Sequence, residues 1–490
     1  MTQSRNVRWM PWAVGLLALV VGGWESWRPG PWHDEIATLT AAERSWGALF
    51  TMLHHVDAVH GLYYVIAKSW GILWGPSVDS LRVLSVLAVA ATSVLLTRLA
   101  ASLWTPVAGL VAGVGFVLLP RAQWSATEAR SYALSALLVT IVVVCLVRTL
   151  ERGGRWWAGY GLALWAAGAL FVYSMLMLPV LVAVVVLQRP PARWMQRFWA
   201  VTTGALLGVA PIALLTMGQR SQVAWLQRVT SWKTALAGPA AVFFDHTRPV
   251  GLVVWGLLLL AGLVVLVWNT RRPLSEGTGL LRPAAVLTLV LGWSVVPLAT
   301  LELVSTEYAL FYPRYLTLSG PGVALLLGAC AVGPAARWRA AVALGLVAAV
   351  AYGPWKDARR WDSKDVLPQV AATVSSDRKP GDDVLFPAPK RSDRTPRIAM
   401  YAYPEAFSGM TDLTLKDSFE TSGQLWETNL PLASVASRLA TARRIIRVGY
   451  GTVQGLSPEE QRLLRAAGLR LTRQDRMGGW SVMVFDRKPQ

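Results

Sequence analysis

The nineteen residues 250–268 read VGLVVWGLLLLAGLVVLVW and contain no charged side chain. A helix needs about 20 predominantly apolar residues to cross the hydrocarbon core of a bilayer, so this stretch predicts a membrane-spanning helix. Ten further runs, each with at most one charge near an end, have the same character. We predict eleven spans in all, over residues 10–24, 81–97, 105–120, 132–147, 157–172, 174–188, 198–217, 250–268, 283–301, 311–330 and 338–354.

The composition of the whole chain agrees with a membrane protein. Of its 490 residues, 54% are hydrophobic and 15% are charged, against about 25% charged residues in soluble domains. An ordinary soluble enzyme and a disordered chain are therefore both excluded. The net charge of +19 does not indicate nucleic acid, because the basic residues separate apolar runs instead of forming a basic face. Cys145 and Cys330 each lie inside an apolar run and support neither a disulfide nor a cysteine metal site.

The charges between the runs predict the topology. With a cytoplasmic N-terminus, the inner segments hold fourteen basic residues and only two acidic ones, Glu151 and Glu276, which is a strong positive-inside pattern. The fourteen are Arg5, Arg8, Arg98, Arg148, Arg152, Arg155, Arg189, Arg193, Arg197, Arg271, Arg272, Arg282, Arg337 and Arg339. This pattern requires a break near Tyr173–Ser174, between the fifth and sixth runs. No small-residue cleavage site follows the first run, which we expect to remain as a helix.

The chain divides into two predicted domains. Residues 1–355 form the transmembrane domain, and residues 356–490, where charges and turn signals become frequent, form a small extracytoplasmic α/β domain. In the latter, Ser457-Pro458-Glu459-Glu460 is a capping box with proline at the first helical position, followed by a stop at Gly468. Met477-Gly478-Gly479 is flanked by segments typical of a hairpin, and Val384–Phe386 and Ile445–Val448 are strand candidates.

The first outer loop, over about residues 28–80, is where we expect the chemistry. Asp34 and Glu35 lie about ten residues beyond the first span, and adjacent carboxylates beside a bilayer indicate hydration, pairing or function. The alternative is that Asp34 is a solvated loop acid or caps a helix beginning near Glu35. The aromatic stretch Trp46–Trp74 favours helices in the membrane interface.

Four histidines of this loop, His33, His54, His55 and His60, lie near acids and raise the possibility of a divalent metal. No HExxH or comparable spacing is present, so contacts to substrate or to neighbouring site residues are the alternative.

Two other outer loops carry candidate residues. Glu128 and Arg130 lie where the fourth span begins, where they are either an ion-paired boundary or substrate ligands. Arg314 lies among aromatic residues before the tenth span, and its guanidinium can donate two parallel hydrogen bonds to a phosphate. The alternative for Arg314 is an extended side chain that reaches the headgroups.

Taken in order along residues 10–330, the predicted spans and the motifs of the outer loops resemble those of the GT-C superfamily of polyprenyl-phosphate-sugar-dependent glycosyltransferases. This superfamily includes protein O-mannosyltransferases, lipid A aminoarabinose transferases and bacterial mannosyltransferase-like proteins. The matching marks are Asp34-Glu35, then Asp57, His60, Tyr63 and Tyr64, then Ser77–Arg82, Thr127–Tyr132 and Pro313–Leu316.

The resemblance implies a mechanism and a set of partners. Asp34 would be the general base for an acceptor hydroxyl that attacks the anomeric carbon with inversion, with Glu35 beside it. Arg314 and Arg130 would stabilise the polyprenyl phosphate leaving group. The remaining implied substrate-binding residues are Asp57, His60, Tyr63, Glu128, Tyr132 and Tyr315. The partners would be a polyprenyl-phosphate-linked sugar, a glycan, lipid or protein acceptor, and membrane lipids.

The resemblance also implies where the protein is located, and two alternative functions stay open. The protein would lie in the plasma membrane, with the active site and the C-terminal domain outside the cytoplasm, and mannose is the default sugar because it is common among the relatives. No GxGxxG or P-loop motif occurs, which agrees with a lipid-activated donor. The main alternative is a transporter or flippase of a lipid-linked sugar, and a second is a non-catalytic assembly protein.

Overall fold

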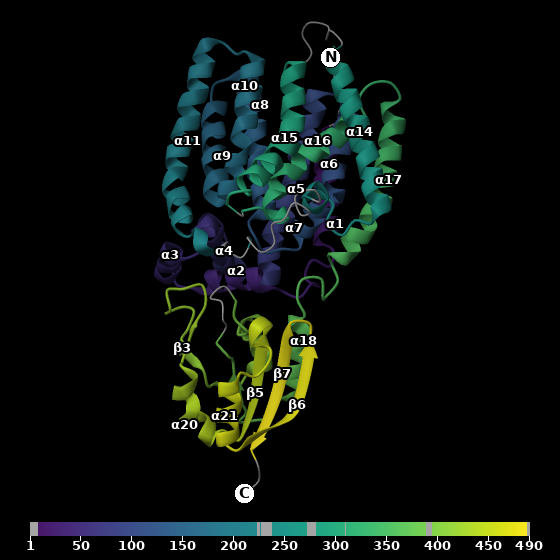
Figure 1. Cartoon of the computed structure of the whole chain (residues 1–490). Coiled ribbons are helices and arrows are strands. Elements are labelled where there is room, and N and C mark those ends of the chain that lie inside the picture. The colour runs from purple at the N-terminus through teal and green to yellow at the C-terminus, as the bar shows by residue number, and fades with distance from the viewer. Residues whose placement is uncertain are drawn as a thin grey trace. The chain divides into compact units, whose positions relative to one another are not determined.

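The computed structural model describes residues 8–222, 226, 238–271, 281–308, 310–388 and 394–487, and the chain packs into two compact units (Figure 1). Unit 1 comprises Met1–Trp27, Ala58–Ile66 and Asp79–Arg359. Unit 2 comprises Arg28–Asp57, Ala67–Val78 and Arg360–Gln490. Most of the predicted outer loop therefore belongs to the same unit as the C-terminal part of the chain.

The regular elements described in unit 1 are helices, and α9 packs against both α8, which precedes it along the chain, and α11. The helices wholly or partly in this unit are α1 Met10–Gly23, η2 Ala58–His60, α4 Gly61–Trp74, α5 Val78–Leu103, α6 Pro106–Leu118, α7 Pro120–Ala126, α8 Tyr132–Arg152, α9 Trp156–Leu170, η3 Val172–Met177, α10 Leu178–Gln188, α11 Ala192–Gly218, α13 Gly238–Phe243, α14 Pro249–Arg271, α15 Pro283–Val304, η5 Pro313–Ser319, α16 Gly320–Ala329 and α17 Ala336–Asp357.

Each of the eleven predicted apolar runs contains a helix. Among the described residues, five helices are long and apolar enough to cross a membrane, and α6 with α7, bent by 58°, makes a sixth if the pair is one span. The five are Val78–Leu103, Tyr132–Arg152, Ala192–Gly218, Pro249–Trp268 and Pro283–Val304. The chain is thus a multi-pass helical membrane protein, but eleven separate spans are not established. Arg5, Arg272 and Glu276 of the charge pattern lie outside the described residues.

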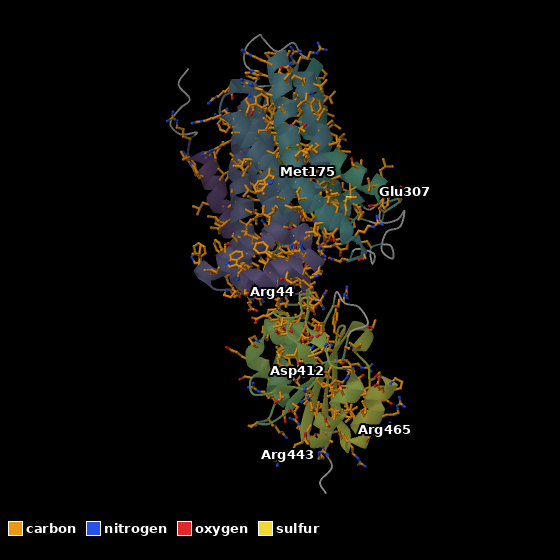
Figure 2. All side chains as sticks on the ribbon, turned by 90° about the vertical axis from the view of Figure 1, so that its left-hand side faces the viewer. Arg44, Met175, Glu307, Asp412, Arg443 and Arg465 are labelled. Carbon is orange, nitrogen blue, oxygen red and sulfur yellow. The ribbon has the colours of Figure 1, made fainter. Side chains whose placement is uncertain are left out.

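The backbone departs from the α-helix at two places in or between the predicted runs. The expected break between the fifth and sixth runs is present, because Phe171 is extended and η3 separates α9 from α10. Met175, labelled in Figure 2, lies in η3. The prediction of one continuous helix over 311–330 is wrong in its first half, which forms the 3-10 helix η5 with a kink at Leu316. Pro313 and Pro321 each start a new helix because proline lacks a backbone donor and restricts the residue before it.

Unit 2 combines helices with a small sheet. Its elements are α2 His33–Glu43, α3 Trp46–His55, the end of α4, α18 Leu367–Asp377, β1 Asp383–Leu385, α19 Ile398–Ala402, η6 Pro404–Phe407, β2 Thr411–Asp412, β3 Leu415–Asp417, β4 Thr428–Asn429, η7 Leu432–Val435, α20 Ala436–Thr441, β5 Arg444–Tyr450, η8 Gly451–Val453, α21 Pro458–Ala466, β6 Leu469–Met477 and β7 Trp480–Arg487.

The main sheet of unit 2 has the strand order β2-β1-β5-β7-β6. β1 pairs in parallel with β2 and β5, whereas β7 pairs antiparallel with β5 and β6, which lie on either side of it in Figure 1. Ile445 of β5 pairs with Asp383 of β1 and Phe485 of β7. β3 and β4 form a separate two-stranded sheet.

Both faces of this sheet are covered, as a buried central strand requires. Side chains alternate along β5, so Ile446 belongs to one hydrophobic core and Ile445 to the other. The first core includes residues of α18 and α19 together with Ile36, Ala37 and Leu39 of α2. The second includes Leu439 of α20 and Leu464 of α21. Helix α2 of the outer loop is therefore part of the core of unit 2.

The local predictions in this unit are confirmed. Both reciprocal hydrogen bonds of the capping box between Ser457 and Glu460 are present, and Gly468 follows the helix with a φ of +71°. β6 and β7 form the predicted hairpin around Gly478, where φ is +55°. The strand candidates near 384 and 445 are β1 and β5.

Candidate active site

The predicted acid pair lies in the first turn of α2. The helix begins at His33 after Trp32, so Asp34 and Glu35 are both inside it, and the alternative that Asp34 is a helix cap is excluded. Carboxylates in a first turn are stabilised by the helix dipole. The backbone carbonyl of Asp34 accepts a hydrogen bond from the Thr38 hydroxyl at 3.2 Å, as expected for a regular helix position.

The two acids have different surroundings. Glu35 is fully buried, and its carboxylate lies 3.5 Å from the ammonium of Lys364, whose side chain is 1% exposed. Asp34 is half-buried. Because a buried charge needs a partner, Glu35 is part of the internal structure of unit 2, whereas Asp34 has access to solvent.

The residue before the pair also faces the C-terminal part of the chain. The ring of His33 lies 4.7 Å from that of Tyr450 and 6.4 Å from that of Trp480, measured between centroids. The indole of Trp480 donates to Asp365 at 2.8 Å. These contacts place the start of α2 among residues of β5, β7 and the segment before α18.

A second group of predicted residues converges in unit 1, and we call it the cation cluster. It consists of His60, Tyr64, Arg130, Tyr132, Arg314 and Tyr315, together with Ser131, Phe171, Tyr173 and Tyr312. Arg130 donates to the Tyr64 hydroxyl at 3.1 Å, and Nδ1 of His60 lies 3.2 Å from Oγ of Ser131. Residues 127–131 form the turn between α7 and α8 that brings these groups to η2 and α4.

Aromatic rings connect this turn with η5. The guanidinium of Arg314 lies 4.5 Å from the ring centre of Tyr312 and 5.9 Å from that of Tyr132. Tyr315 lies 6.1 Å from Tyr132 and 5.1 Å from Tyr173. Four segments that are far apart in the sequence therefore meet, and cation–π contacts hold Arg314 among them.

His60 is neutral in this setting. Its ring is buried and stacks on Phe171 at 5.7 Å with an interplanar angle of 7°. Burial and then the positive charges of Arg130 and Arg314 lower the pKa of His60 well below its usual range. A neutral imidazole can form hydrogen bonds without adding a further positive charge.

The other predicted residues take varied positions. Tyr63 is fully buried beside Tyr64, and Glu128 accepts a hydrogen bond from the Trp124 indole at 3.0 Å. Asp57 is half-buried and has a left-handed φ of +61° at the point where the chain passes from unit 2 to unit 1. Asp34, Glu35 and Asp57 thus belong to unit 2, and the other predicted site residues belong to unit 1.

Sequence reasoning named none of Phe171, Tyr173, Tyr312 and Lys364 as site residues, and it included Ser131 only as part of the Thr127–Tyr132 motif. The break near Tyr173 was visible as an interruption in an apolar stretch, but nothing local connected it with His60. Lys364 carried no signal at all. Among the described residues, no group of three or more His, Cys, Asp and Glu side chains could hold a metal ion, so the histidines of the loop do not form a protein-only divalent site.

The sequence matches no protein-family model and no curated protein. Its fold does match solved structures. ArnT from Cupriavidus metallidurans bound to undecaprenyl phosphate is 13% identical, with a TM-score of 0.56 over 98% of each chain. The oligosaccharyltransferase of Archaeoglobus fulgidus, solved with an acceptor peptide, is 8% identical, with a TM-score of 0.50 over 90% of this chain and 69% of that one.

The arabinofuranosyltransferase AftD from Mycobacteria is a third similar structure. It is 15% identical, with a TM-score of 0.51 over 100% of this chain, which spans 42% of AftD. All three are GT-C proteins. At these identities the comparison shows the fold, and the chain has the GT-C fold that its sequence motifs predicted.

Proposed function

We propose that this protein, which has the GT-C fold, is a membrane glycosyltransferase that moves a sugar from a polyprenyl phosphate to an acceptor hydroxyl. The observation that carries the proposal is the likeness to ArnT over 98% of both chains, which includes the loop with Asp34 and the C-terminal part of the chain. ArnT was solved with undecaprenyl phosphate, and an A. fulgidus neighbour with dolichol-phosphate, so both bind lipid-linked phosphates.

The cation cluster supports a phosphate leaving group. Negative charge grows on the polyprenyl phosphate as the glycosidic bond breaks, and fixed cations stabilise that charge more in the transition state than in the ground state. Arg314 can donate two parallel hydrogen bonds to such a phosphate, and Arg130 is the second cation. The neutral His60 and the surrounding tyrosines supply polar groups and flat ring faces suited to a sugar.

We assign the general base to Asp34. The half-buried carboxylate in the first turn of α2 has access to solvent, whereas Glu35 is buried against Lys364. Asp34 would take the proton from the acceptor hydroxyl as the oxygen attacks the anomeric carbon. The polyprenyl phosphate leaves from the opposite side, so the product has inverted configuration. Glu35 supports Asp34 from within the helix.

The proposal also specifies the membrane face of the active site and the sugar that is transferred. The predominance of arginine in the segments assigned to the cytoplasm supports an active site on the outer face of the membrane. Mannose is the proposed sugar, and arabinose is tested beside it because AftD is an arabinofuranosyltransferase.

The test is transfer by purified protein from radiolabelled polyprenyl-phosphate mannose or arabinose to a membrane extract. Wild type, Asp34→Asn and Glu459→Gln are compared, since Glu459 is an exposed acid in the first turn of α21 and serves as a matched control. We expect wild type and Glu459→Gln to transfer, and Asp34→Asn to lose transfer while its unfolding temperature is unchanged. The anomeric configuration of the product is read by NMR.

Two results would overturn the proposal. Transfer by Asp34→Asn at the wild-type rate removes the assigned base. Absence of transfer from every donor, combined with movement of a labelled lipid-linked sugar across proteoliposomes, favours a flippase.

A further inference from the structure

The outer loop and the C-terminal part of the chain form one hydrophobic core in unit 2. Ile36, Ala37 and Leu39 of α2 are each at most 5% exposed and share a core with Leu367, Val370, Ile446 and Trp480. Removing this apolar face from water stabilises the position of α2 on the sheet. The helix that carries Asp34 is therefore built on residues from the end of the chain.

Polar contacts fix both ends of this helix. Before it, the Gly30 amide donates to the Trp361 carbonyl at 2.8 Å, and a Cβ on Gly30 would lie 2.9 Å from the Asp365 carbonyl, so only glycine fits. After it, the buried guanidinium of Arg44 donates to the Gln424 and Leu425 carbonyls at 2.8 and 2.9 Å (Figure 2).

One contact acts directly on the acid pair. The Lys364 ammonium and the Glu35 carboxylate are 3.5 Å apart, with side-chain exposures of 1% and 0%. At this depth each charge needs a partner, since an isolated buried carboxylate is strongly disfavoured, and each of the two provides one for the other. Glu35 follows Asp34 directly in the first turn of α2, so displacement of one residue moves the other.

We infer that Lys364 is a positioning residue for the turn that carries Asp34, so that the C-terminal part of the chain sets the position of the proposed base. The inference rests on the proposed role of Asp34 as general base. Lys364 does not touch the reacting atoms. It fixes Glu35 in the first turn of α2 and thereby sets the position from which Asp34 reaches the acceptor hydroxyl.

The test compares Lys364→Met, which keeps the length of the side chain and removes its charge, with Lys364→Arg and Lys416→Met. Lys416 is the matched control, because it is an exposed lysine of the same unit that lies 3.7 Å from Asp417. We expect Lys364→Met to lower kcat by about 100-fold with little change in KM, as for a catalytic group displaced by about 1 Å. Lys364→Arg should recover most of kcat, and Lys416→Met should match wild type.

A second measurement does not depend on transfer. Hydrogen exchange of the amides at residues 33–37 should be faster in Lys364→Met than in wild type or Lys416→Met, since the first turn loses its anchor. The double variant Glu35→Gln with Lys364→Met, which removes both charges, should exchange more slowly than Lys364→Met alone.

The outcomes separate this inference from the proposed function. If wild type transfers and Lys364→Met keeps its kcat, or if Lys364→Arg fails to recover kcat, Lys364 does not position the turn. If no variant transfers, wild type included, the proposed function fails by itself. The hydrogen-exchange measurement then decides the inference alone. If the amides of residues 33–37 exchange at the wild-type rate in Lys364→Met, the inference is wrong as well. If they exchange faster than in wild type, Lys364 does anchor the turn.

Discussion

The cation cluster of unit 1 and a buried arginine network of unit 2 place the same side chain in different surroundings. In the network, Arg397 is completely buried and donates to Asp412 at 2.5 Å and to Glu427 at 2.9 Å (Figure 2). Its guanidinium also lies 5.2 Å from the ring of Phe386. In the cluster, Arg314 is half-buried in a 3-10 helix against the rings of Tyr132 and Tyr312.

This difference separates an arginine that maintains the fold from one suited to a ligand. Arg397 is enclosed together with two carboxylates, so its charge is balanced inside unit 2 and its removal leaves two buried anions. Arg314 is half-buried against the ring faces of Tyr132 and Tyr312, and its proposed role is to bind a phosphate. We therefore expect changes at Arg397 to alter stability and changes at Arg314 to alter transfer.

The largest expected effect is on the network. Arg397→Met should lower the free energy of unfolding of unit 2 by about 3–5 kcal/mol, because Asp412 and Glu427 lose the cation between them. Denaturant unfolding followed by Trp fluorescence measures the change, with Arg443→Met as the control, since Arg443 is exposed. A loss below about 1 kcal/mol would mean that the network contributes little to the fold.

The next effect is on the cluster. Arg314→Ala should lower kcat for transfer by about 10²–10³-fold, the usual loss when one donor to a developing oxyanion is removed. The kcat of Arg314→Lys should lie between those of wild type and Arg314→Ala, because an ammonium keeps the charge but cannot form the paired hydrogen bonds. Steady-state transfer kinetics test both variants against Arg443→Ala. An unfolding temperature that falls as far as in Arg397→Met would assign Arg314 to the fold instead.

The smallest effect concerns an acid of unit 2 and depends on pH. Burial raises the pKa of Asp365 to about 6, against the hydrogen bonds from Trp480 and Val366, which lower it. The folded protein then binds a proton that the unfolded chain has already lost, so stability falls as pH rises from about 4 to 6.

Asp365→Asn removes this penalty and keeps an oxygen acceptor for Trp480. The variant should be more stable than wild type by about 3 kcal/mol at pH 7.5 and equal to it near pH 4, as read from unfolding at each pH. A variant that is less stable than wild type at pH 7.5 would show that the charge of Asp365 is needed in the fold.

The features predicted correctly from the sequence depend on neighbours in the chain. The capping box at Ser457, the turn at Gly478 and the apolar runs are all set by interactions within a few residues. The start of the tenth run was mistaken for an α-helix because its apolar character was clear while the effect of Pro313 on the backbone was not weighed.

The features that were missed depend on distant residues. His60 was predicted as a substrate-binding residue, but its stacking on Phe171 was not foreseen. Glu35 was expected to orient the acceptor or Asp34, whereas the structure pairs it with Lys364, more than 300 residues further along the chain. Long-range pairs of this kind depend on how α2 packs on the sheet, and the spacing of residues in the sequence does not predict that packing.

The assembly of unit 2 from separate stretches has a consequence for biosynthesis. Arg28–Asp57 and Ala67–Val78 leave the ribosome first, and Asp79–Arg359 must be made before the remaining stretch of the unit begins. At roughly 5–20 residues per second, this delay lasts about 15–55 s. During that time Ile36 and Leu39 lack the sheet that later covers them. A chain that stops early keeps this apolar face exposed, which gives cellular quality control a feature by which to recognise incomplete molecules.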